Sequence, residues 1–280
     1  MTRPRVIFMV AVTAAWGYVI GVGRYGLGSL AFGHFAATLL GTSLAAAGGT
    51  VLNSYLERDV DALMERTRNR PLPRGVLPPL HALAFGLYLV TAGLLTLLLF
   101  VDLTTAFLVL LANFLYVLVY TPMKRLSPLN TTIGAIPGAI PPMVGWAAAR
   151  GYVGVEAWML FLVLFVWQHP HVYAIAWMYR DEYSRAGFRM LSHGDVDGRR
   201  TSLGVLLGCI VLIATAAWPA VSGVLSLTYL VTTTVMGMFL LVLGRRLAIS
   251  RSVEAARRLM RATVVYLPLL LASALVDVLL

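Results

Sequence analysis

The chain is poor in charged residues and almost free of cysteine. Only 12% of its 280 residues are Asp, Glu, Lys or Arg, and its mean hydropathy is +0.82, whereas soluble domains carry about 25% charged residues. This composition excludes an ordinary soluble domain and indicates a membrane protein. Cys209 is the only cysteine, so the chain forms no internal disulfide and no cysteine-only metal site. We interpret Cys209 as a small core residue.

The sequence contains many long apolar runs. A run needs roughly 20 residues to cross a hydrocarbon layer of about 30 Å. Nine such runs are centred near Ala14, Leu39, Leu89, Val109, Gly138, Val166, Val211, Met236 and Leu269. Arg3 and Arg5 precede the first run as in a signal peptide, but no convincing cleavage site follows it, so we expect a retained helix. We predict an all-α integral membrane protein with nine transmembrane helices, and residues 1–280 form a single polytopic membrane domain.

Basic residues are divided very unevenly between the loops. Of the 22 Lys and Arg residues, 20 precede the first run or follow even-numbered runs, and the other loops contain only Arg24 and Arg150. The positive-inside rule then places the N-terminus in the cytoplasm and the C-terminus outside the cell, with the chain in the inner (plasma) membrane. This topology also explains the net charge of +10. The expected environment is the lipid bilayer, and nucleic acid is not an expected partner.

Acidic residues gather in two of the predicted cytoplasmic loops, near residues 53–78 and 180–202. Eight of the 12 acids lie there, namely Glu57, Asp59, Asp61 and Glu65 in the first loop and Asp181, Glu182, Asp195 and Asp197 in the second. Magnesium takes carboxylate and phosphate oxygens, and arginine binds the phosphate oxygens that remain. Acids mixed with arginines at a helix end therefore suit a divalent metal that carries a phosphate or a diphosphate.

Helical geometry sharpens this expectation for the first loop. If the preceding helix continues at about 100° per residue, Asn53, Glu57 and Asp61 form one stripe and Asp59 faces away. The alternative is an ordinary charged loop with accidental alignment. Arg66 and Arg70 follow four residues apart, and they are either membrane-surface anchors or a clamp for a diphosphate.

The second acidic loop follows the stretch WQHPHVYAIAWMYRDEY. If that helix is unbroken, His171 and Glu182 share a face, with His171 about 16 Å deeper in the membrane. A histidine at such depth is a functional candidate. The alternative is a histidine that is hydrogen-bonded to a neighbouring helix. His169 is the less promising of the two.

A third stretch joins a basic helix end to an irregular span. Lys124, the only lysine in the chain, lies four residues after Tyr120 and beside Arg125. The following span contains Gly134, Pro137, Gly138, Pro141, Pro142 and Gly145. Such residues are tolerated at membrane depth where a helix lines a cavity or is packed by its neighbours. We predict that this span borders a pocket.

Three motifs together resemble the UbiA superfamily of intramembrane prenyltransferases, and within it the protohaem IX farnesyltransferase (haem O synthase) subfamily. They are NSYLERDVDALMERTRNRPL, YTPMKRLSPLNTTIGAIPGAIPPMVGW and MYRDEYSRAGFRML, and PRVIFMVAVTAAWGY is similar to the first helix. The resemblance covers most of the chain. It implies the UbiA prenyltransferase fold, with nine helices around a central cavity, Mg2+ as cofactor and a polyprenyl diphosphate as donor.

The resemblance also implies roles for single residues. The metal ligands would be Asn53, Glu57, Asp61, Asp59, Asp181 and Glu182, with Asp59 given less weight. The diphosphate ligands would be Arg66, Arg70, Tyr120, Lys124 and Arg125. Asn53, Glu57, Asp61 and Lys124 are the expected catalytic residues. Glu57 stands where aspartate is more usual, the D-x-x-x-D spacing is absent at Asp181, and the LSHGDVDG segment departs from the pattern.

The expected reaction joins farnesyl diphosphate to a vinyl group of haem b. Haem binding is assigned to His171 and Gln168, while pairing of arginines with the propionates, or iron without a protein ligand, are alternatives. An aromatic quinone precursor is the alternative acceptor. A transporter would place its charges near the membrane midplane, and a haem-handling factor would not need the acidic stripe. The sequence leaves open whether the protein forms a homo-oligomer and whether it binds a protein partner from the haem pathway.

Overall fold

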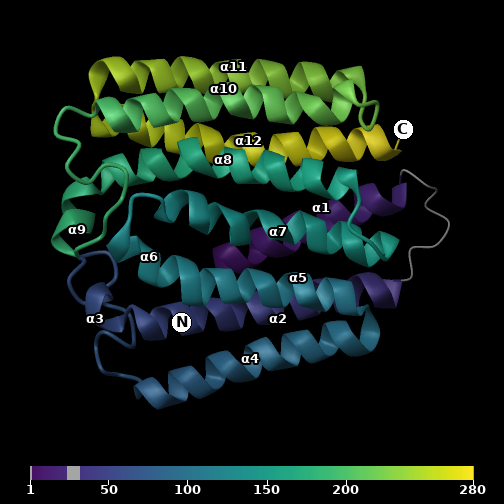
Figure 1. Ribbon diagram of the computed structural model, residues 1–280, viewed down its shortest axis with the longest axis horizontal. Coiled ribbons are helices and arrows are strands. Elements are labelled where there is room, and N and C mark those ends of the chain that lie inside the picture. Colours follow the sequence, from purple (N-terminus) through teal and green to yellow (C-terminus); the bar gives the residue numbers. More distant parts are fainter. Residues whose placement is uncertain (1, 24–31, 280) are drawn as a thin grey trace.

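The computed structural model describes residues 2–23 and 32–279, and every regular element within them is a helix (Figure 1). The elements are α1 (Pro4–Gly23), α2 (Phe32–Leu56), α3 (Arg58–Asp61), α4 (Pro79–Phe100), α5 (Leu103–Phe114), the π-helical turn η1 (Leu115–Tyr120), α6 (Thr121–Leu126), α7 (Asn130–Arg150), α8 (Val155–Met178), α9 (Arg180–Arg185), α10 (Arg199–Val221), α11 (Leu227–Ser250) and α12 (Val253–Leu279). Arg24, which entered the charge count, lies outside the described residues.

The nine predicted spans correspond to nine helical segments of this described part, with α5, η1 and α6 forming one segment. Eight of these segments are long and apolar enough to cross a membrane. The ninth, α7, contains Pro137, Pro141 and Pro142, and 14 of its 21 residues are buried. Because α7 contacts protein rather than lipid over most of its surface, it needs no apolar outer face. The prediction of an all-helical membrane protein is confirmed.

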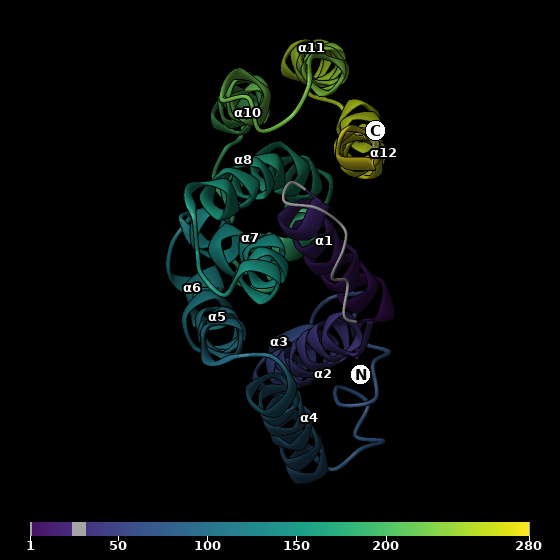
Figure 2. The ribbon, with the colours of Figure 1, turned by 90° about the vertical axis from the view of Figure 1, so that its right-hand side faces the viewer.

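The helices form a ring with an additional outer layer. Viewed along their axes, α1, α2, α5, α7 and α8 surround a central region, α4 covers α2, and α10, α11 and α12 lie beyond α8 (Figure 2). The closest crossing joins α1 to α7, where a methyl group at Gly17 or Gly145 would overlap backbone atoms of the other helix. Small residues at such a crossing let two membrane helices approach closely.

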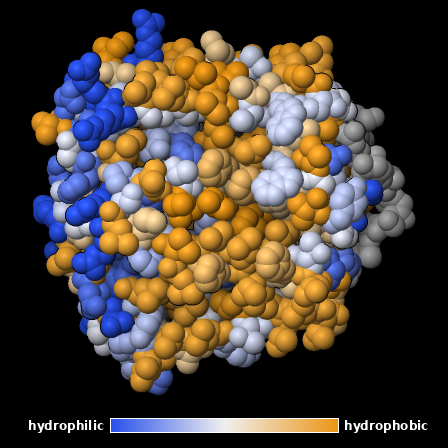
Figure 3. All heavy atoms as spheres, viewed as in Figure 1, coloured by the Kyte–Doolittle hydropathy of each residue, from blue (hydrophilic) through white to orange (hydrophobic). Residues whose placement is uncertain are grey.

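The short helices α3, α6 and α9 gather at one end of the bundle, on the left in Figure 1. The same end is hydrophilic in the space-filling view, whereas the flank of the bundle is mostly hydrophobic (Figure 3). Both predicted acidic loops therefore lie at one polar face. We call this end the polar face.

The helices that enter these loops are interrupted at positions where we expected each helix to continue. In the first loop α2 ends at Leu56 and α3 begins at Arg58, although Asp61 N–H still donates to the carbonyl oxygen of Glu57 at 2.7 Å, so the helical register persists. In the second loop the prediction of an unbroken helix to Glu182 is wrong. There α8 ends at Met178, Tyr179 leaves the helical conformation and a separate helix, α9, begins at Arg180.

Candidate active site

A polar cavity of about 150 Å³ opens at the polar face, and we call it the mouth. Its lining combines acids, bases and aromatic rings from loops that are far apart in sequence. The lining residues are Arg3, Glu57, Asp61, Met64, Arg66, Thr67, Arg70, Tyr120, Lys124, Tyr183, Phe188 and Met190. Most of the residues expected to bind metal and diphosphate therefore surround one cavity.

The stripe predicted from helical periodicity is buried beside the mouth, which Glu57 and Asp61 line and Asn53 does not. Asn53, Glu57 and Asp61 are 0%, 6% and 1% exposed. Each carboxylate has a basic partner, because Lys124 Nζ lies 2.7 Å from Glu57 Oε1 and Arg70 lies 2.6 Å from Asp61 Oδ2. Buried carboxylates are costly unless they are paired, so these bases hold the two carboxylates in place.

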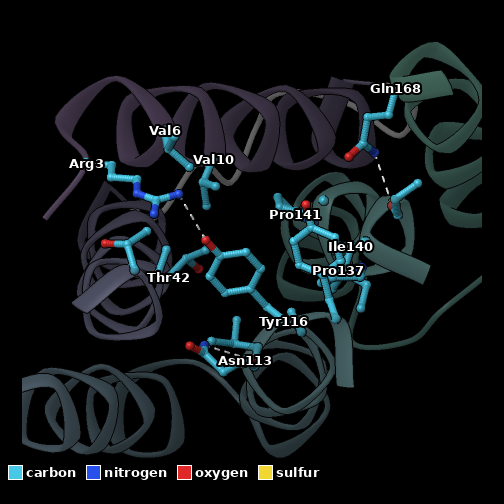
Figure 4. A pocket seen from close by; sticks show the side chains of 18 of the residues that line it. Arg3, Val6, Val10, Thr42, Asn113, Tyr116, Pro137, Ile140, Pro141 and Gln168 are labelled. Carbon is cyan, nitrogen blue, oxygen red and sulfur yellow. Dashed lines mark hydrogen bonds between the residues drawn. The ribbon is translucent and has the colours of Figure 1, made fainter. Parts of the chain in front are cut away.

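Asn53 is held by polar neighbours on two other segments. Its amide nitrogen donates to Thr121 Oγ1 at 2.9 Å, and its Oδ1 accepts from the Arg3 guanidinium at 2.8 Å. Arg3 also donates to the Tyr116 hydroxyl at 3.5 Å, a contact visible in Figure 4. In the sequence, Arg3 is recognisable only as a basic residue before the first helix. No sequence signal separates it from a topology determinant.

The rim of the mouth joins the two acidic loops to each other. The backbone N–H of Arg66 donates to Glu182 Oε1 at 3.0 Å, and its guanidinium donates to the Tyr183 hydroxyl at 3.2 Å. That guanidinium also lies over the ring of Tyr179, 5.0 Å from the ring centroid. Arg66 is thus fixed beside the cavity, and Glu182 acts here as an acceptor that positions the first loop.

Several predicted site residues lie outside the mouth. The side chains of Asp59 and Asp181 are 84% and 87% exposed. Each forms an ion pair with the arginine that directly precedes it in sequence. Arg125 is exposed and lines neither this cavity nor the one below. Their assignment to metal or diphosphate stays a prediction that this geometry does not favour.

One acid of the second loop has a local structural role. Asp195 is 5% exposed, and its carboxylate accepts from the backbone N–H groups of Arg200 and Thr201 and from the Thr201 hydroxyl. Burial raises the pKa of this carboxyl, but these hydrogen bonds outweigh it and hold the pKa below the ordinary range. Asp195 therefore caps the start of α10 and does not face the mouth.

A second, mainly apolar cavity of about 330 Å³ lies below the mouth, and we call it the chamber. The two share Arg3, Tyr120 and Lys124 as lining residues. Apolar side chains from α1, α2, α5 and α7 form most of the wall, among them Val6, Val10, Ala46, Val109, Ala112, Ile140 and Val144. Figure 4 shows Tyr116 reaching into this space, with Thr42 and Asn113 also on the wall.

The turn η1 orients the tyrosines and the lysine of the shared lining. A single π-helical turn shifts the register of a helix, and such turns are frequent at functional sites. Tyr116 and Tyr120 stack with ring centroids 5.8 Å apart, and Lys124 Nζ lies 4.6 Å from the Tyr120 centroid. The predicted Y-x-x-x-K pair therefore lies between the polar mouth and the apolar chamber.

His171 and Gln168 lie on different sides of α8. Gln168 lines the chamber and donates to the Ala135 carbonyl oxygen at 3.1 Å. His171 lines neither cavity, stacks on Trp167, and has its Nδ1 2.8 Å from the hydroxyl of Thr263. That hydroxyl donates to the carbonyl oxygen of Met260, so it accepts from Nδ1–H and leaves the Nε2 lone pair unprotonated.

The residues of the mouth suit magnesium together with an anionic substrate. Two carboxylates and an amide lie on one stripe, but the described residues bring no cluster of three Asp, Glu, His or Cys side chains together. Magnesium commonly binds through one or two carboxylates and completes its shell with substrate phosphates and water. Asn53, Glu57 and Asp61 fit that incomplete set.

Comparison with known proteins places this geometry in a family. The model of the UbiA prenyltransferase family matches residues 10–267. The chain is 40% identical to a protoheme IX farnesyltransferase of Solibacter usitatus, over 99% of this chain and 97% of that protein. It is 38% identical to the protoheme IX farnesyltransferase of Aquifex aeolicus, over 99% of this chain and 93% of that protein.

Solved structures share the fold at low sequence identity. A UbiA homologue from Aeropyrum pernix superposes with a TM-score of 0.73 at 16% identity, covering all of both chains. A UbiA homologue from Archaeoglobus fulgidus bound to GPP and Mg2+ gives 0.61 at 15% identity, covering 96% of this chain and 97% of that one. By sequence and by fold, the chain belongs to the UbiA prenyltransferase family.

Proposed function

We propose that the protein transfers the farnesyl group of farnesyl diphosphate to a vinyl group of protohaem IX. The observation that carries this proposal is the adjacency of a polar mouth and an apolar chamber, which share Arg3, Tyr120 and Lys124 as lining residues. A prenyl diphosphate has this same division into a polyanionic head and an apolar chain. The names of the relatives that are about 40% identical support haem as the acceptor.

The diphosphate would be held by Arg66, Arg70 and Lys124, with Arg3 as a fourth base. Guanidinium groups form strong, charge-assisted hydrogen bonds with phosphate oxygens. In this structure Arg70 and Lys124 are paired with Asp61 and Glu57. Substrate binding therefore exchanges partners: the bases turn to the diphosphate, and the carboxylates are released to bind a cation.

Asn53, Glu57 and Asp61 would hold the magnesium ion, whose positive charge would stabilise the departing diphosphate. The bond between the allylic carbon and the diphosphate oxygen breaks, and its electron pair leaves with the diphosphate. Arg66, Arg70 and Lys124 stabilise the negative charge that develops there. The apolar walls of the chamber keep water away from the farnesyl cation until the acceptor attacks.

The acceptor step forms one carbon–carbon bond. The terminal carbon of the vinyl group attacks the farnesyl cation, and the remaining positive charge moves to the carbon next to the porphyrin ring. Water adds at that carbon and loses a proton, so the product carries one farnesyl and one hydroxyl group. A chamber of about 330 Å³ lies at the small end of ligand pockets. We expect the chamber to take the prenyl chain while the tetrapyrrole stays outside and presents its vinyl edge.

His171 is our candidate for contact with the haem, and Gln168 lies one helical turn away in the chamber wall. The Nδ1–H of His171 is engaged by Thr263, which is the arrangement that orients a histidine for a metal through Nε2. Among the described residues no hydrogen-bond partner lies at Nε2. This geometry supports an iron ligand on the α8 side that faces α12, beside the chamber rather than within it.

The orientation in the membrane is part of the same proposal. The basic residues of the described loops lie at the polar face, and Arg150 ends α7 at the other end of the bundle. We infer that the polar face is cytoplasmic, that the membrane is the plasma membrane and that the C-terminus is external. Farnesyl diphosphate, a soluble cytoplasmic anion, would then meet the mouth directly.

The test offers two kinds of acceptor to membranes that contain the protein, with farnesyl diphosphate and Mg2+. We expect protohaem to gain one farnesyl and one hydroxyl group, and hydroxybenzoate or naphthoate to stay unmodified. A site that orients a tetrapyrrole does not hold a single small ring against the cation, and orientation supplies much of the rate. Prenylated aromatic acid beside unmodified haem would contradict the haem proposal and leave the family assignment intact.

A further inference from the structure

The greatest concentration of uncompensated charge lies away from the mouth. Residues 245–261, around the turn between α11 and α12, contain six arginines and only one acid, Glu254. By contrast, each acidic loop carries five arginines with four acids. The positive-inside rule accounts for the sign of the charge at this turn. It does not account for the accumulation of half the net charge of +10 at one corner of the molecule.

A cavity of about 380 Å³ lies at this turn. Arg246 and Arg258 contribute guanidinium groups to its wall, Ser250 and Ser252 contribute hydroxyls, and Leu243 and Ile249 contribute apolar surface. The carboxylate of Glu254 and the side chain of Ala255 complete the lining. Leu243 is about 10 Å below Ser250 along α11 by helix rise. The wall is therefore polar at Ser250 and Ser252 and apolar at Leu243, which lies deeper along α11, and this division suits a phospholipid.

The turn is held in one conformation by contacts to α8. Arg251 adopts a left-handed backbone conformation with φ of 50°, and its N–H donates to the carbonyl oxygen of Leu247 at 2.7 Å. Its own carbonyl oxygen accepts from the indole N–H of Trp177 at 3.0 Å. Because a non-glycine residue in this region is strained and needs support from its surroundings, the cavity is preformed by the fold.

The local acid does not neutralise the cavity. Glu254 accepts from Arg257 at 3.0 Å and from Arg258 Nε at 3.3 Å. Arg258 therefore keeps its two terminal nitrogens for another anion. Among the described residues Arg246 has no carboxylate within ion-pair distance. Two guanidinium groups that have N–H donors available for an anion therefore face one cavity.

We propose that this cavity binds the headgroup of an anionic phospholipid. Arg246 and Arg258 bind its phosphate, Ser250 and Ser252 donate to its oxygens, and an acyl chain runs along Leu243 and Ile249. Basic pockets between transmembrane helices are suited to such headgroups. The site is built from α11 and α12 and shares no lining residue with the mouth or the chamber, so it is independent of the proposed reaction.

The test is native mass spectrometry of the full chain in detergent doped with phosphatidylglycerol or with phosphatidylcholine. We expect the wild type to retain phosphatidylglycerol and not phosphatidylcholine. The variant R246Q/R258Q should retain phosphatidylglycerol roughly 30-fold less tightly, since each arginine near a headgroup contributes about a factor of five. The matched control is R245Q/R261Q, which removes the same charge from exposed arginines of α11 and α12 that neither line the cavity nor pair with Glu254.

The control should bind the anionic lipid within about twofold of the wild type, because electrostatic attraction by exposed charges alone is weak and screened. Equal loss in both double variants would show a diffuse basic surface and overturn the proposal, as would equal retention in all three proteins. Unchanged turnover of farnesyl diphosphate by R246Q/R258Q in phosphatidylcholine vesicles verifies that this variant is folded.

Discussion

At the scale of single residues, the buried acids of the mouth form ion pairs with basic side chains. Glu57 with Lys124 and Asp61 with Arg70 are each within 2.7 Å. Both acids are almost fully buried, so each needs an opposite charge in every state of the reaction. The bases serve this purpose in this structure, and in the proposed reaction a cation that binds with the diphosphate would serve it afterwards.

Asp61→Asn should lower turnover of farnesyl diphosphate by roughly 100-fold or more, because a carboxylate proposed to bind the magnesium ion is lost while the shape is kept. Steady-state turnover in membranes, with size-exclusion chromatography to check folding, measures the effect. The control Asp59→Asn changes an exposed acid of the same loop and should leave turnover within about twofold. A comparable loss of turnover in both variants would show that the stripe of Asn53, Glu57 and Asp61 is not part of the active site.

Arg3→Gln should raise the KM for farnesyl diphosphate roughly tenfold, since a charge-assisted hydrogen bond contributes about 1.5 kcal/mol or more. Arg5 is exposed, two residues away, and lines neither cavity. Arg5→Gln is therefore the matched control, and its KM should match that of the wild type. Equal KM values in the two variants would show that Arg3 does not bind the diphosphate and acts only as a topology determinant.

Arg3 also illustrates what the sequence could and could not predict. Asn53, Glu57 and Asp61 were found because helical periodicity is a property of neighbouring residues, and it survived the break after Leu56. Arg3 enters the mouth because α1 crosses between α7 and α2, with an arginine at its start that contacts Asn53 of α2. That contact joins residues 50 positions apart, and no local pattern encodes it.

At the scale of secondary-structure elements, the breaks after α2 and α8 fold the two acidic loops over the mouth. The predicted continuation of α8 failed at Tyr179 because the chain turns there to bring Glu182 and Tyr183 to Arg66. The loop that follows is docked in turn, since Arg189 N–H donates to the carbonyl oxygen of Lys124 at 2.7 Å. Tertiary contacts of this kind override local helix preference.

The α10 cap yields a pH prediction. The pKa of Asp195 is lowered in the fold, so the stabilisation it provides is complete above its unfolded pKa, near 3.9, and disappears as pH falls through the folded pKa. Asp195→Asn should therefore lower the melting temperature at neutral pH by a few degrees, for a loss of about 1 kcal/mol. The gap between the two melting curves should close as pH falls below about 4. A gap that is constant with pH would contradict an ionised cap.

At the scale of the whole molecule, the polar face, the mouth and the chamber follow one direction along the bundle (Figures 1 and 3). In the proposed reaction the anionic head of the donor would enter from the polar face, and its apolar chain would extend into the chamber between α1, α2, α5 and α7. The nine-segment topology could be predicted because hydropathy and charge are summed over many residues. The ring arrangement that creates the chamber could not, because it depends on which faces of these helices meet.

Reporter fusions test the orientation. Fusions after Arg74, Gly194 and Ser252 should report a cytoplasmic location, and a fusion at Leu280 an external one, because most of the basic residues lie at the polar face. Alkaline phosphatase and a fluorescent protein give opposite readouts at each position. A cytoplasmic C-terminus would contradict the orientation and the count of nine spans together.

The most direct test of the central claim is mass spectrometry of haems extracted from cells that express this protein. We expect a new haem that is heavier than protohaem by one farnesyl and one hydroxyl group, and we expect it to be absent from cells that express Asp61→Asn at the same level. Farnesylation without the hydroxyl group would contradict the capture of the haem-side cation by water. Protohaem alone, in cells that contain abundant folded wild-type protein, would contradict the proposed reaction itself.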